Sequence, residues 1–430
     1  MKRAVVLSGG AALGAYELGA WRYLREINYH YDIVTGTSIG AIMGGFMCVG
    51  DYEGCEDLWL NTGAEDVYVN GVNFDDAFFE NMDRKKAKNL VDIGKEYFKN
   101  EGLNITPFKT LIHSKLNAKA IHESPVQLGI VTCVYPGMRE EDFILQYVDE
   151  DLVLPYIHCS SAAWPVLPLE KIGNKKYADG GYRNNVPVDL AIKMGADEIV
   201  AIRFDPFPKL PQHGELLRLP FVINIVPFSP LDGGVGSLDP TCIRRNIERG
   251  YCDAGKAFGK FAGYNYTFHK DPGLESKCRP IMARVVRNYP RKLTDLTKLV
   301  GIHHNPFVAT TSTALVLRSF ELLAEILKID NVPIYHLSEW MALIARKIIA
   351  LGDSLLNQKR AFEIKWGGRV KPDEIEPFFL YLYDCYQRRE MPRNLNQIIN
   401  NNPIAILLLE ALNLFEKRGY LKTAPRLGGR

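Results

Sequence analysis

Residues 3–24 have the sequence RAVVLSGGAALGAYELGAWRYL, and three patterns in this stretch decide the fold. The short apolar run Arg3–Leu7 is typical of a buried strand. Gly9 and Gly10 interrupt it with a turn signal. From Leu13 onward, apolar residues recur at steps of three and four, the spacing of one helix face. The stretch therefore predicts a strand, a glycine loop and a helix.

The same alternation continues along the chain. We expect further strands at Asp32–Thr35, Gln127–Val134, Phe143–Tyr147 and Glu198–Phe204, with a helix over Val188–Met194. Strands that alternate with helices favour a mainly parallel sheet with helices on both faces. The predicted fold class is therefore α/β, with a three-layer α/β/α domain.

The character of the sequence changes after this domain. Residues 205–240 are rich in proline and glycine, which predicts a long irregular excursion. Beyond residue 306 the apolar spacing is helical, with buried stripes expected at Val316, Phe320, Leu323 and Leu327 and at Leu337, Met341, Ile344, Ile348, Leu351 and Leu355. We predict an α/β domain over residues 1–285 and an all-helical region over 286–430.

Composition excludes several classes of protein. The 430 residues include 52 basic and 50 acidic side chains, and this balance argues against nucleic acid as the main partner. None of the eight cysteines forms a C-x-x-C pair, so neither a zinc site nor a thioredoxin motif is indicated. Buried free thiols favour a reducing, cytoplasmic location.

Two apolar stretches resemble membrane signals without matching them. The run after Arg3 ends too early for the core of a signal peptide. The uncharged stretch Ile33–Gly50 approaches the length of a spanning helix but contains five glycines, which fit a strand, a tight turn and a buried helix better. We expect no membrane span.

The glycine loop Gly9–Gly14 follows a strand and opens a helix, where main-chain amides converge on an anion. A dinucleotide fingerprint needs glycine where Ala11 stands, and a phosphate-binding P-loop needs lysine and serine or threonine where Ala15 and Tyr16 stand. An oxyanion-binding loop remains. The alternative is a tight turn that packs the helix on the sheet.

The segment Gly36-Thr37-Ser38-Ile39-Gly40 matches G-x-S-x-G between a strand and a helix. This pattern is typical of a nucleophile elbow, in which the flanking glycines allow a sharp turn that exposes the Ser38 hydroxyl at a helix N-terminus. The alternative is a glycine-rich helix start that Ser38 caps.

A serine nucleophile needs a base. Five histidines are available as a base, and none of them lies in a recognisable signature: His158, His269, His303, His304 and His336. Asp179 is the stronger candidate, because it ends an apolar run and is followed by Gly180 and Gly181. A second such triplet begins at Asp232, where a plain turn is the better interpretation.

Together these pieces resemble the patatin-like phospholipase family. The resemblance is carried by residues 7–16, 36–40, 160–165, 179–181, 184–187 and 249–254. It extends from residue 1 to about residue 260, and no family resemblance is found over residues 290–430. Two positions depart from the family pattern: Ala11 replaces a third glycine, and Leu13 replaces a lysine or arginine.

The resemblance implies a Ser–Asp dyad without histidine. Ser38 is then the nucleophile and Asp179 the base, with Gly10 and Ala11, joined by Gly9, as oxyanion donors. Gly36 and Gly40 shape the elbow, and Gly180 and Gly181 complete the D-G-G motif.

The implied activity is acyl-ester hydrolysis on a phospholipid or another acyl-ester lipid, with peripheral membrane contact and without metal or cofactor. Two alternatives stay open: a catalytically weak or inactive binding or effector protein, which Leu13 favours, and a soluble esterase or thioesterase. The helical region is open to interpretation as a lid, a membrane-docking module or an interface of a homo-oligomer.

Overall fold

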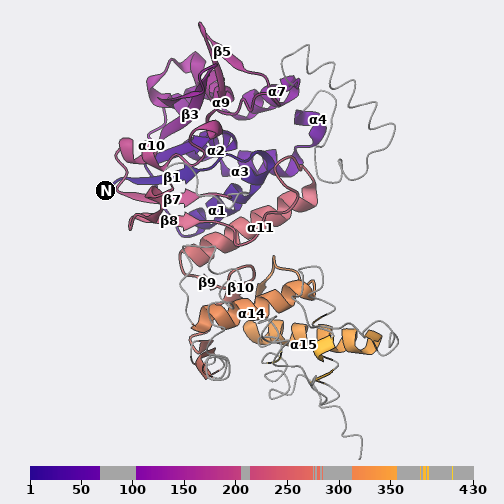
Figure 1. The fold of residues 1–430 in the computed structure, drawn as a ribbon. Helices are drawn as coiled ribbons and strands as arrows, with labels where there is room; N and C mark the ends of the chain where they lie inside the picture. Colours follow the sequence, from indigo (N-terminus) through magenta and orange to yellow (C-terminus); the bar gives the residue numbers. More distant parts are fainter. Residues whose placement is uncertain are drawn as a thin grey trace, which may run out of the picture. The chain divides into compact units, whose positions relative to one another are not determined.

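The structure of the chain is a computed structural model that describes residues 1–67, 103–204, 214–274 and 312–355, together with positions 276, 278–280, 283, 378, 381–383, 385–386 and 409. The chain divides into two compact units, Met1–Phe258 and Gly259–Arg430 (Figure 1). Each unit has its own hydrophobic core.

The first unit is built around one eight-stranded sheet. Its strands are β1 Arg3–Leu7, β2 Ile33–Thr37, β3 Gln127–Tyr135, β4 Arg139–Ile144, β5 Glu170–Ile172, β6 Lys175–Asp179, β7 Glu198–Ile202 and β8 Val222–Ile225. The order is β5-β6-β3-β2-β1-β7-β8, and β4 also pairs with β3. The five strands from β8 to β3 are parallel, whereas β4, β5 and β6 pair antiparallel. The predicted mainly parallel sheet is confirmed.

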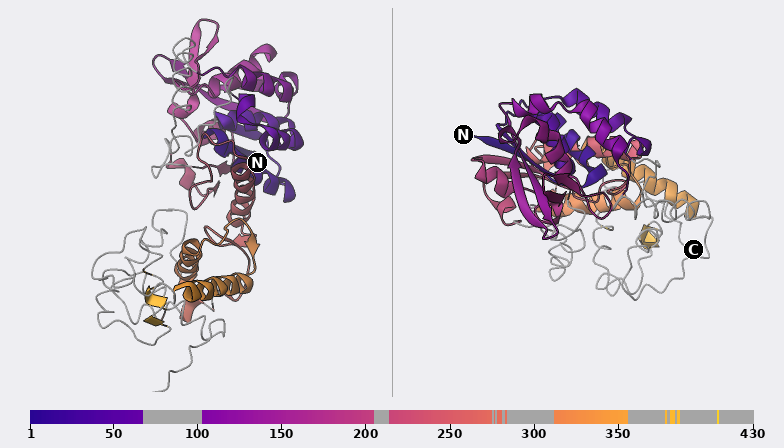
Figure 2. Two further views of the ribbon diagram at one scale, coloured as in Figure 1. Left: turned by 90° about the vertical axis from the view of Figure 1, so that its right-hand side faces the viewer. Right: turned by 90° about the horizontal axis from the view of Figure 1, so that it is seen from above.

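Helices cover both faces of this sheet, as the three-layer prediction requires. They are α1 Ala15–Glu26, α2 Ile39–Val49, α3 Tyr52–Asn61, α4 Ala64–Val67, α7 Thr106–Lys115, α8 Ala118–His122, α9 Val153–Ser160, α10 Val188–Lys193 and α11 Pro240–Ala257. The helices α1, α2, α3 and α11 share one core with one face of the strands, and α10 packs on the other face beside Thr35 and Gly129. Figure 2 shows the helices of the first 60 residues, in indigo, grouped together against the strands.

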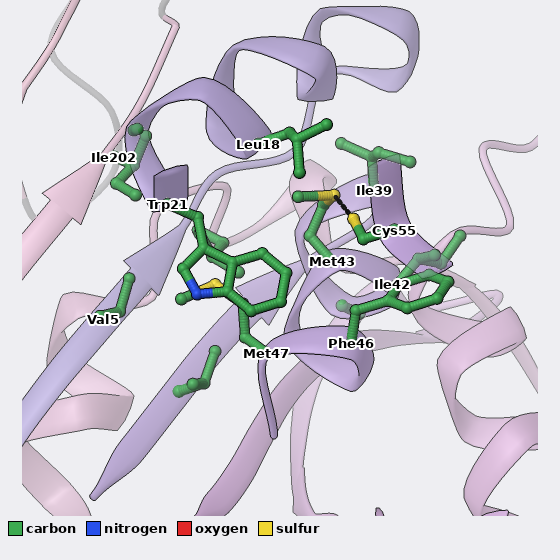
Figure 3. Packing of buried hydrophobic residues seen from close by; sticks show 14 of the residues in the cluster. Val5, Leu18, Trp21, Ile39, Ile42, Met43, Phe46, Met47, Cys55 and Ile202 are labelled. Carbon is green, nitrogen blue, oxygen red and sulfur yellow. Dashed lines mark hydrogen bonds between the residues drawn. The ribbon is translucent and has the colours of Figure 1, made fainter. Parts of the chain in front are cut away.

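The core between α1, α2, α3 and the sheet is dense and aromatic. Figure 3 shows Trp21 of α1 on the same side as Val5 of β1 and Ile202 of β7, and Phe46 of α2 on the side of Ile42. The sulfur atoms of Met43 and Cys55 lie 3.4 Å apart and join α2 to α3. This packing fixes the two helices that begin at the glycine loop and at Ser38.

Two local predictions were wrong. The strand expected at Phe143–Tyr147 lies earlier, at Arg139–Ile144, because β4 pairs antiparallel with β3 after a tight turn, and a short 3₁₀ helix follows at Leu145–Tyr147. The region 205–240 is not irregular throughout, because β8 pairs parallel with β7 within it.

The second unit is mainly helical in its described part, with α14 at Ser312–Ile326 and α15 at Leu337–Leu355. It also has a small sheet of β9 Phe261–Ala262, β10 Thr267–His269 and β11 Ile334–Tyr335. The predicted stripe of Val316, Phe320, Leu323 and Leu327 is buried in its core.

The boundary between the units lies at residue 258, earlier than the predicted residue 285. Tyr266 and Phe268 belong to the core formed by α14 and α15. Glu321 also accepts hydrogen bonds from the amides of Tyr264 and Asn265, at 2.8 and 3.1 Å. These contacts assign β9 and β10 to the second unit.

All eight cysteines are free thiols. Within the described ranges, no helix combines the length and the apolar character needed to cross a bilayer.

Candidate functional site

The register of the sheet brings Ser38 and Asp179 to the same level. Thr37, the last residue of β2, pairs with Val131 of β3, and the next β3 residue, Thr132, pairs with Asp179 at the end of β6. Ser38 directly follows Thr37. Two residues that are far apart in the sequence therefore meet at one edge of the sheet, with a single strand between them.

Ser38 lies on a sharp turn between β2 and α2. Its backbone has φ 58° and ψ −123°, a left-handed conformation that L residues rarely adopt. The turn is tight on both sides, because a Cβ at Gly36 would lie 2.1 Å from the Gly40 carbonyl oxygen and one at Gly40 would lie 2.6 Å from the Leu7 carbonyl oxygen. This is the geometry expected of a nucleophile elbow.

Asp179 is a buried carboxyl group that faces this turn. Burial raises its pKa to about 6, against the lowering effect of hydrogen bonds from the Ser38 side chain and the Gly181 amide. The Gly181 amide donates to Oδ1 at 2.7 Å. A carboxylate with this pKa is ionised at neutral pH and is a stronger base than an exposed aspartate.

The glycine loop passes directly beside Ser38, since a Cβ at Gly9 would lie 3.0 Å from the Ser38 Cβ. The Gly9 amide donates to the Asn185 carbonyl oxygen at 3.1 Å, so this amide already has an acceptor, and its role as an oxyanion donor stays a prediction. Within the described part of the chain, the amides of Gly10 and Ala11 have no acceptor. These two amides fit the donor role that the resemblance implies for them.

Asn185 forms two hydrogen bonds with Gly9 of the glycine loop. Its main-chain carbonyl oxygen accepts from the Gly9 amide, and its side-chain Nδ2 donates to the Gly9 carbonyl oxygen at 3.0 Å. The segment that carries Asn185 is held by β2, because the buried hydroxyls of Thr35 and Thr37 donate to the carbonyl oxygens of Pro187 and Asn184 at 3.0 and 2.8 Å.

The C-terminal end of α9 and the residues that follow it support both members of the pair. Ser160 Oγ accepts from the Ser38 amide at 3.0 Å and donates to the Val131 carbonyl oxygen at 2.7 Å. Two residues further on, the Ala162 carbonyl oxygen accepts from the Asp179 amide at 2.8 Å. Sequence reasoning assigned no role to Ser160 or Asn185; the signal was their place in stretches that resemble the family.

Arg249 holds a third segment against the glycine loop. This buried guanidinium donates to the carbonyl oxygens of Ser229 and Pro230 at 2.9 and 2.8 Å. The same segment continues to Val235, whose carbonyl oxygen accepts from the Ala12 amide at 3.0 Å. The stretch 249–254 therefore stabilises the loop from α11.

The competing base candidates lie elsewhere. Asp232 is in a turn and binds Arg245 at 3.0 Å, as its interpretation as a plain turn requires. His158 stacks on His113 with ring centroids 5.2 Å apart, and burial lowers its pKa to about 4. His269 and His336 belong to the second unit, and His303 and His304 lie outside the described residues.

Leu13 is buried in the core rather than presented to the site. In this chain, position 13 contributes to helix packing and places no charge beside the loop. In the described ranges there is no group of three or more histidine, cysteine, aspartate or glutamate side chains that could hold a metal ion.

Fold and site together define an α/β domain with a serine elbow beside a buried aspartate. Residues 5–192, somewhat less than half of the chain, match the model of the family described as patatin-like phospholipase. The resemblance inferred from the sequence is confirmed.

Curated relatives agree with this assignment. Patatin-like phospholipase domain-containing protein 7 of Rattus norvegicus is 28% identical over 203 residues, which cover 46% of this chain and 13% of that protein. Probable lipid hydrolase 463L of Invertebrate iridescent virus 6 is 26% identical over 201 residues, 44% of this chain and 63% of that protein. The chain thus matches only a small part of the rat relative.

Among solved structures, VipD from Legionella pneumophila is 13% identical, with coverage of 100% of this chain and 93% of that chain. Its TM-score of 0.36 is too low to support an argument.

Proposed function

We propose that the first unit is a serine lipid acyl hydrolase of the phospholipase A or lysophospholipase type. The observation that carries the proposal is the Ser38 hydroxyl beside the buried Asp179 carboxylate, next to two main-chain amides that have no acceptor among the described residues. This set supplies a nucleophile, a base and oxyanion donors.

The reaction follows from these roles. Asp179 takes the proton of the Ser38 hydroxyl while Oγ attacks the ester carbonyl carbon. The amides of Gly10 and Ala11 donate to the oxyanion of the tetrahedral intermediate. The alcohol leaves with the proton from Asp179, and an acyl group remains on Ser38. Asp179 then takes a proton from a water molecule as its oxygen attacks the acyl carbon, and it returns this proton to Ser38 Oγ as the bond to the acyl group breaks and the fatty acid leaves.

Exposed apolar side chains on the segments that contact the glycine loop and carry Asp179 favour a lipid as the substrate. Val235 is 51% exposed, and its carbonyl oxygen binds the glycine loop. Tyr182 is 48% exposed. Burial of its hydroxyl and, as the second cause, the charge of Asp179 raise the pKa of the Tyr182 phenol. The Tyr182 hydroxyl donates to the Trp164 carbonyl oxygen, and Val166, two residues on, is 53% exposed. These apolar groups are tied to the segments that form the site, where an acyl chain can contact them.

Covalent labelling tests the nucleophile. A fluorophosphonate should label the wild-type chain and the Ser114→Ala control, since Ser114 is an exposed serine on α7, but not Ser38→Ala. Asp179→Asn should abolish turnover of phospholipid vesicles, and Asp232→Asn should retain it. Labelling that persists in Ser38→Ala, or equal losses in both aspartate variants, would contradict the assignment.

Substrate class is tested with esters of increasing acyl length. Val235→Ser should lower kcat/KM for long-chain esters by about three- to tenfold and leave acetyl esters unchanged, because only a long chain reaches this side chain. Phe221→Ser is the matched control: Phe221 is 38% exposed and precedes β8, at the sheet edge opposite Ser38. Equal turnover of short soluble esters and of vesicles would favour a soluble esterase. Lipid binding without turnover would favour a binding protein.

A further inference from the structure

Arg183 lies one turn of chain after the buried Asp179. Its amide donates to the Gly180 carbonyl oxygen at 2.9 Å, at the end of the 3₁₀ helix Gly180–Tyr182. Its side chain is exposed, and Nε donates to the Met138 carbonyl oxygen at 2.6 Å. This hydrogen bond fixes the guanidinium against the turn between β3 and β4.

The turn that holds Arg183 extends past the level at which Ser38 and Asp179 meet. Thr132 of β3 pairs with Asp179, and β3 continues from there to Tyr135 before the turn begins. The guanidinium therefore lies on the side toward which the carboxyl ends of the parallel strands point, where ligands of such sheets bind.

The charges of Arg183 and Asp179 act on a common neighbour, the buried thiol of Cys133. Burial and then the charge of Asp179 raise the pKa of Cys133, and the charge of Glu140 adds to this effect. The charge of Arg183 lowers the same pKa. The guanidinium is therefore within electrostatic reach of the proposed base.

The Arg183 guanidinium has no anionic partner within the described part of the chain. Its Nε is bound to Met138, and neither Nη group has an acceptor among the described residues. Glu140, the nearby acid, instead accepts from Asn184 Nδ2 at 3.2 Å. Two N–H donor groups thus remain for a ligand beside the site.

A phosphodiester fits these donors, because its two unesterified oxygens share a negative charge and match the fork of a guanidinium. Two other positions do not supply this charge. Lys175 of β6 is paired with Glu141 at 2.7 Å. Leu13 of the glycine loop is an uncharged residue of the core.

We propose that Arg183 binds the phosphate of a phospholipid headgroup while the ester to be cleaved lies at Ser38. This inference rests on the proposed function and narrows its substrate class, because a neutral acylglycerol has no group for the guanidinium to bind. A free phosphate ion offers the same oxygens, so the experiment separates the two ligands.

Selectivity between two monomeric substrates tests this role in the full chain. We would compare kcat/KM for a short-chain lysophosphatidylcholine and for the monoacylglycerol with the same acyl chain, both below the concentration at which they aggregate. The wild type should prefer the phospholipid. Arg183→Gln should lower this preference about tenfold, and Arg183→Lys, which keeps a cation without the fork, should lower it less. Partial unfolding would lower both rates alike and leave their ratio unchanged.

Arg139→Gln is the matched control, since Arg139 is an exposed arginine directly after Met138. Val134 of β3 pairs with Arg139 on one side and with Tyr177 of β6 on the other. The strand β3 therefore separates Arg139 from β6, which carries Asp179, and Arg139→Gln should keep the wild-type preference. An equal loss in the two variants would indicate general attraction by positive charge and overturn the inference.

Competition identifies the ligand. Glycerophosphocholine, a phosphodiester without an acyl ester, should inhibit the wild type competitively and Arg183→Gln about tenfold more weakly. Inhibition by inorganic phosphate alone would assign Arg183 to a free anion and overturn the inference, as would a preference that Arg183→Gln leaves intact. A wild type that turns over neither substrate would contradict the proposed function. One that turns over both with equal kcat/KM would contradict this inference alone.

Discussion

Asp179 combines two opposing influences at one carboxyl group. Burial favours the neutral form, whereas hydrogen bonds from Ser38 and Gly181 favour the anion, and the resulting pKa is about 6. The proposed reaction needs the Asp179 anion. We therefore expect kcat/KM to fall tenfold per pH unit below about pH 6, and a profile that stays flat down to pH 4 would contradict Asp179 as the base.

The same raised pKa predicts that removing the acid stabilises the protein. Below about pH 3.8 the Asp179 carboxyl group is protonated in both the folded and the unfolded chain, so it does not change the folding stability. As pH rises to about 6, only the unfolded chain releases it, and folding stability falls. Asparagine does not titrate, so the Asp179→Asn variant should not lose folding stability in this pH range. It should be inactive and yet more stable than wild type by up to about 3 kcal/mol above pH 6, measured by denaturant unfolding at several pH values.

Ala11 has a backbone φ of 49°, where a side chain costs about 1–2 kcal/mol. Ala11→Gly should raise the free energy of unfolding by up to about 1 kcal/mol, because the relief of strain exceeds the added entropy of the unfolded chain. Asn28→Gly is the matched control. Asn28 has a similar φ of 53°, but asparagine tolerates this region, so its stability should change less. Equal shifts in both variants would exclude strain at Ala11 as the cause.

Ser38 and Asp179 could be found from the sequence because each lies in a short motif whose glycines have a steric reason. Ser160 and Asn185 could not be assigned roles in the same way. Their side chains form hydrogen bonds to main-chain atoms of Ser38 and Gly9, more than 100 residues away. Such contacts depend on the register of β2, β3 and β6, which no local pattern encodes.

At the scale of elements, α1 and α11 cross in backbone contact. A Cβ at Gly19 would lie 1.8 Å from the Ile247 carbonyl oxygen, and one at Gly250 would lie 1.9 Å from the Tyr16 carbonyl oxygen. Each helix therefore presents a glycine to the main chain of the other. The Tyr16 hydroxyl adds a hydrogen bond to Asp253 at 2.9 Å.

Gly19→Ala should lower the free energy of unfolding by about 2–3 kcal/mol, because the helices must separate to admit one methyl group. Gly137→Ala is the control, since a Cβ there would meet no atom within 4 Å. Denaturant unfolding of both variants measures the difference. A Gly19→Ala variant as stable as the control would show that the two helices can move apart without loss.

The predicted strand bounds agree best with the structure where both faces of the strand are buried. β1 has the bounds expected from its apolar run, and β7 begins at the expected Glu198. The strand β8 was missed because its four residues follow a proline-rich stretch, and only pairing with β7 makes them a strand. The predicted bounds of β4 were wrong because its charged sequence, REEDFI, has no apolar pattern before Phe143.

At the scale of the whole molecule, two separate cores predict two independently folding parts. A chain ending at Phe258 keeps every buried residue of the first core, whereas one ending at residue 285 adds Phe261, Tyr266 and Phe268 without α14 and α15. We expect the 1–258 chain to be monodisperse and to unfold cooperatively. The 1–285 chain should aggregate through its added apolar residues.

Light scattering and thermal unfolding of the two truncated chains check this expectation. Ester turnover by the 1–258 chain then measures how much of the proposed activity the first unit supplies alone. An aggregated 1–258 chain beside a monodisperse 1–285 chain would return the boundary to the position predicted from sequence.

The hydroxyls of Thr35 and Thr37 donate hydrogen bonds to the carbonyl oxygens of Pro187 and Asn184. These contacts have a consequence for biosynthesis. During translation, Ser38 leaves the ribosome long before Asp179, and the strand that separates them must be in place before the two can meet. The proposed catalytic pair therefore cannot assemble in a nascent chain until synthesis has passed Pro187, and we expect the proposed hydrolase activity to appear only after that point.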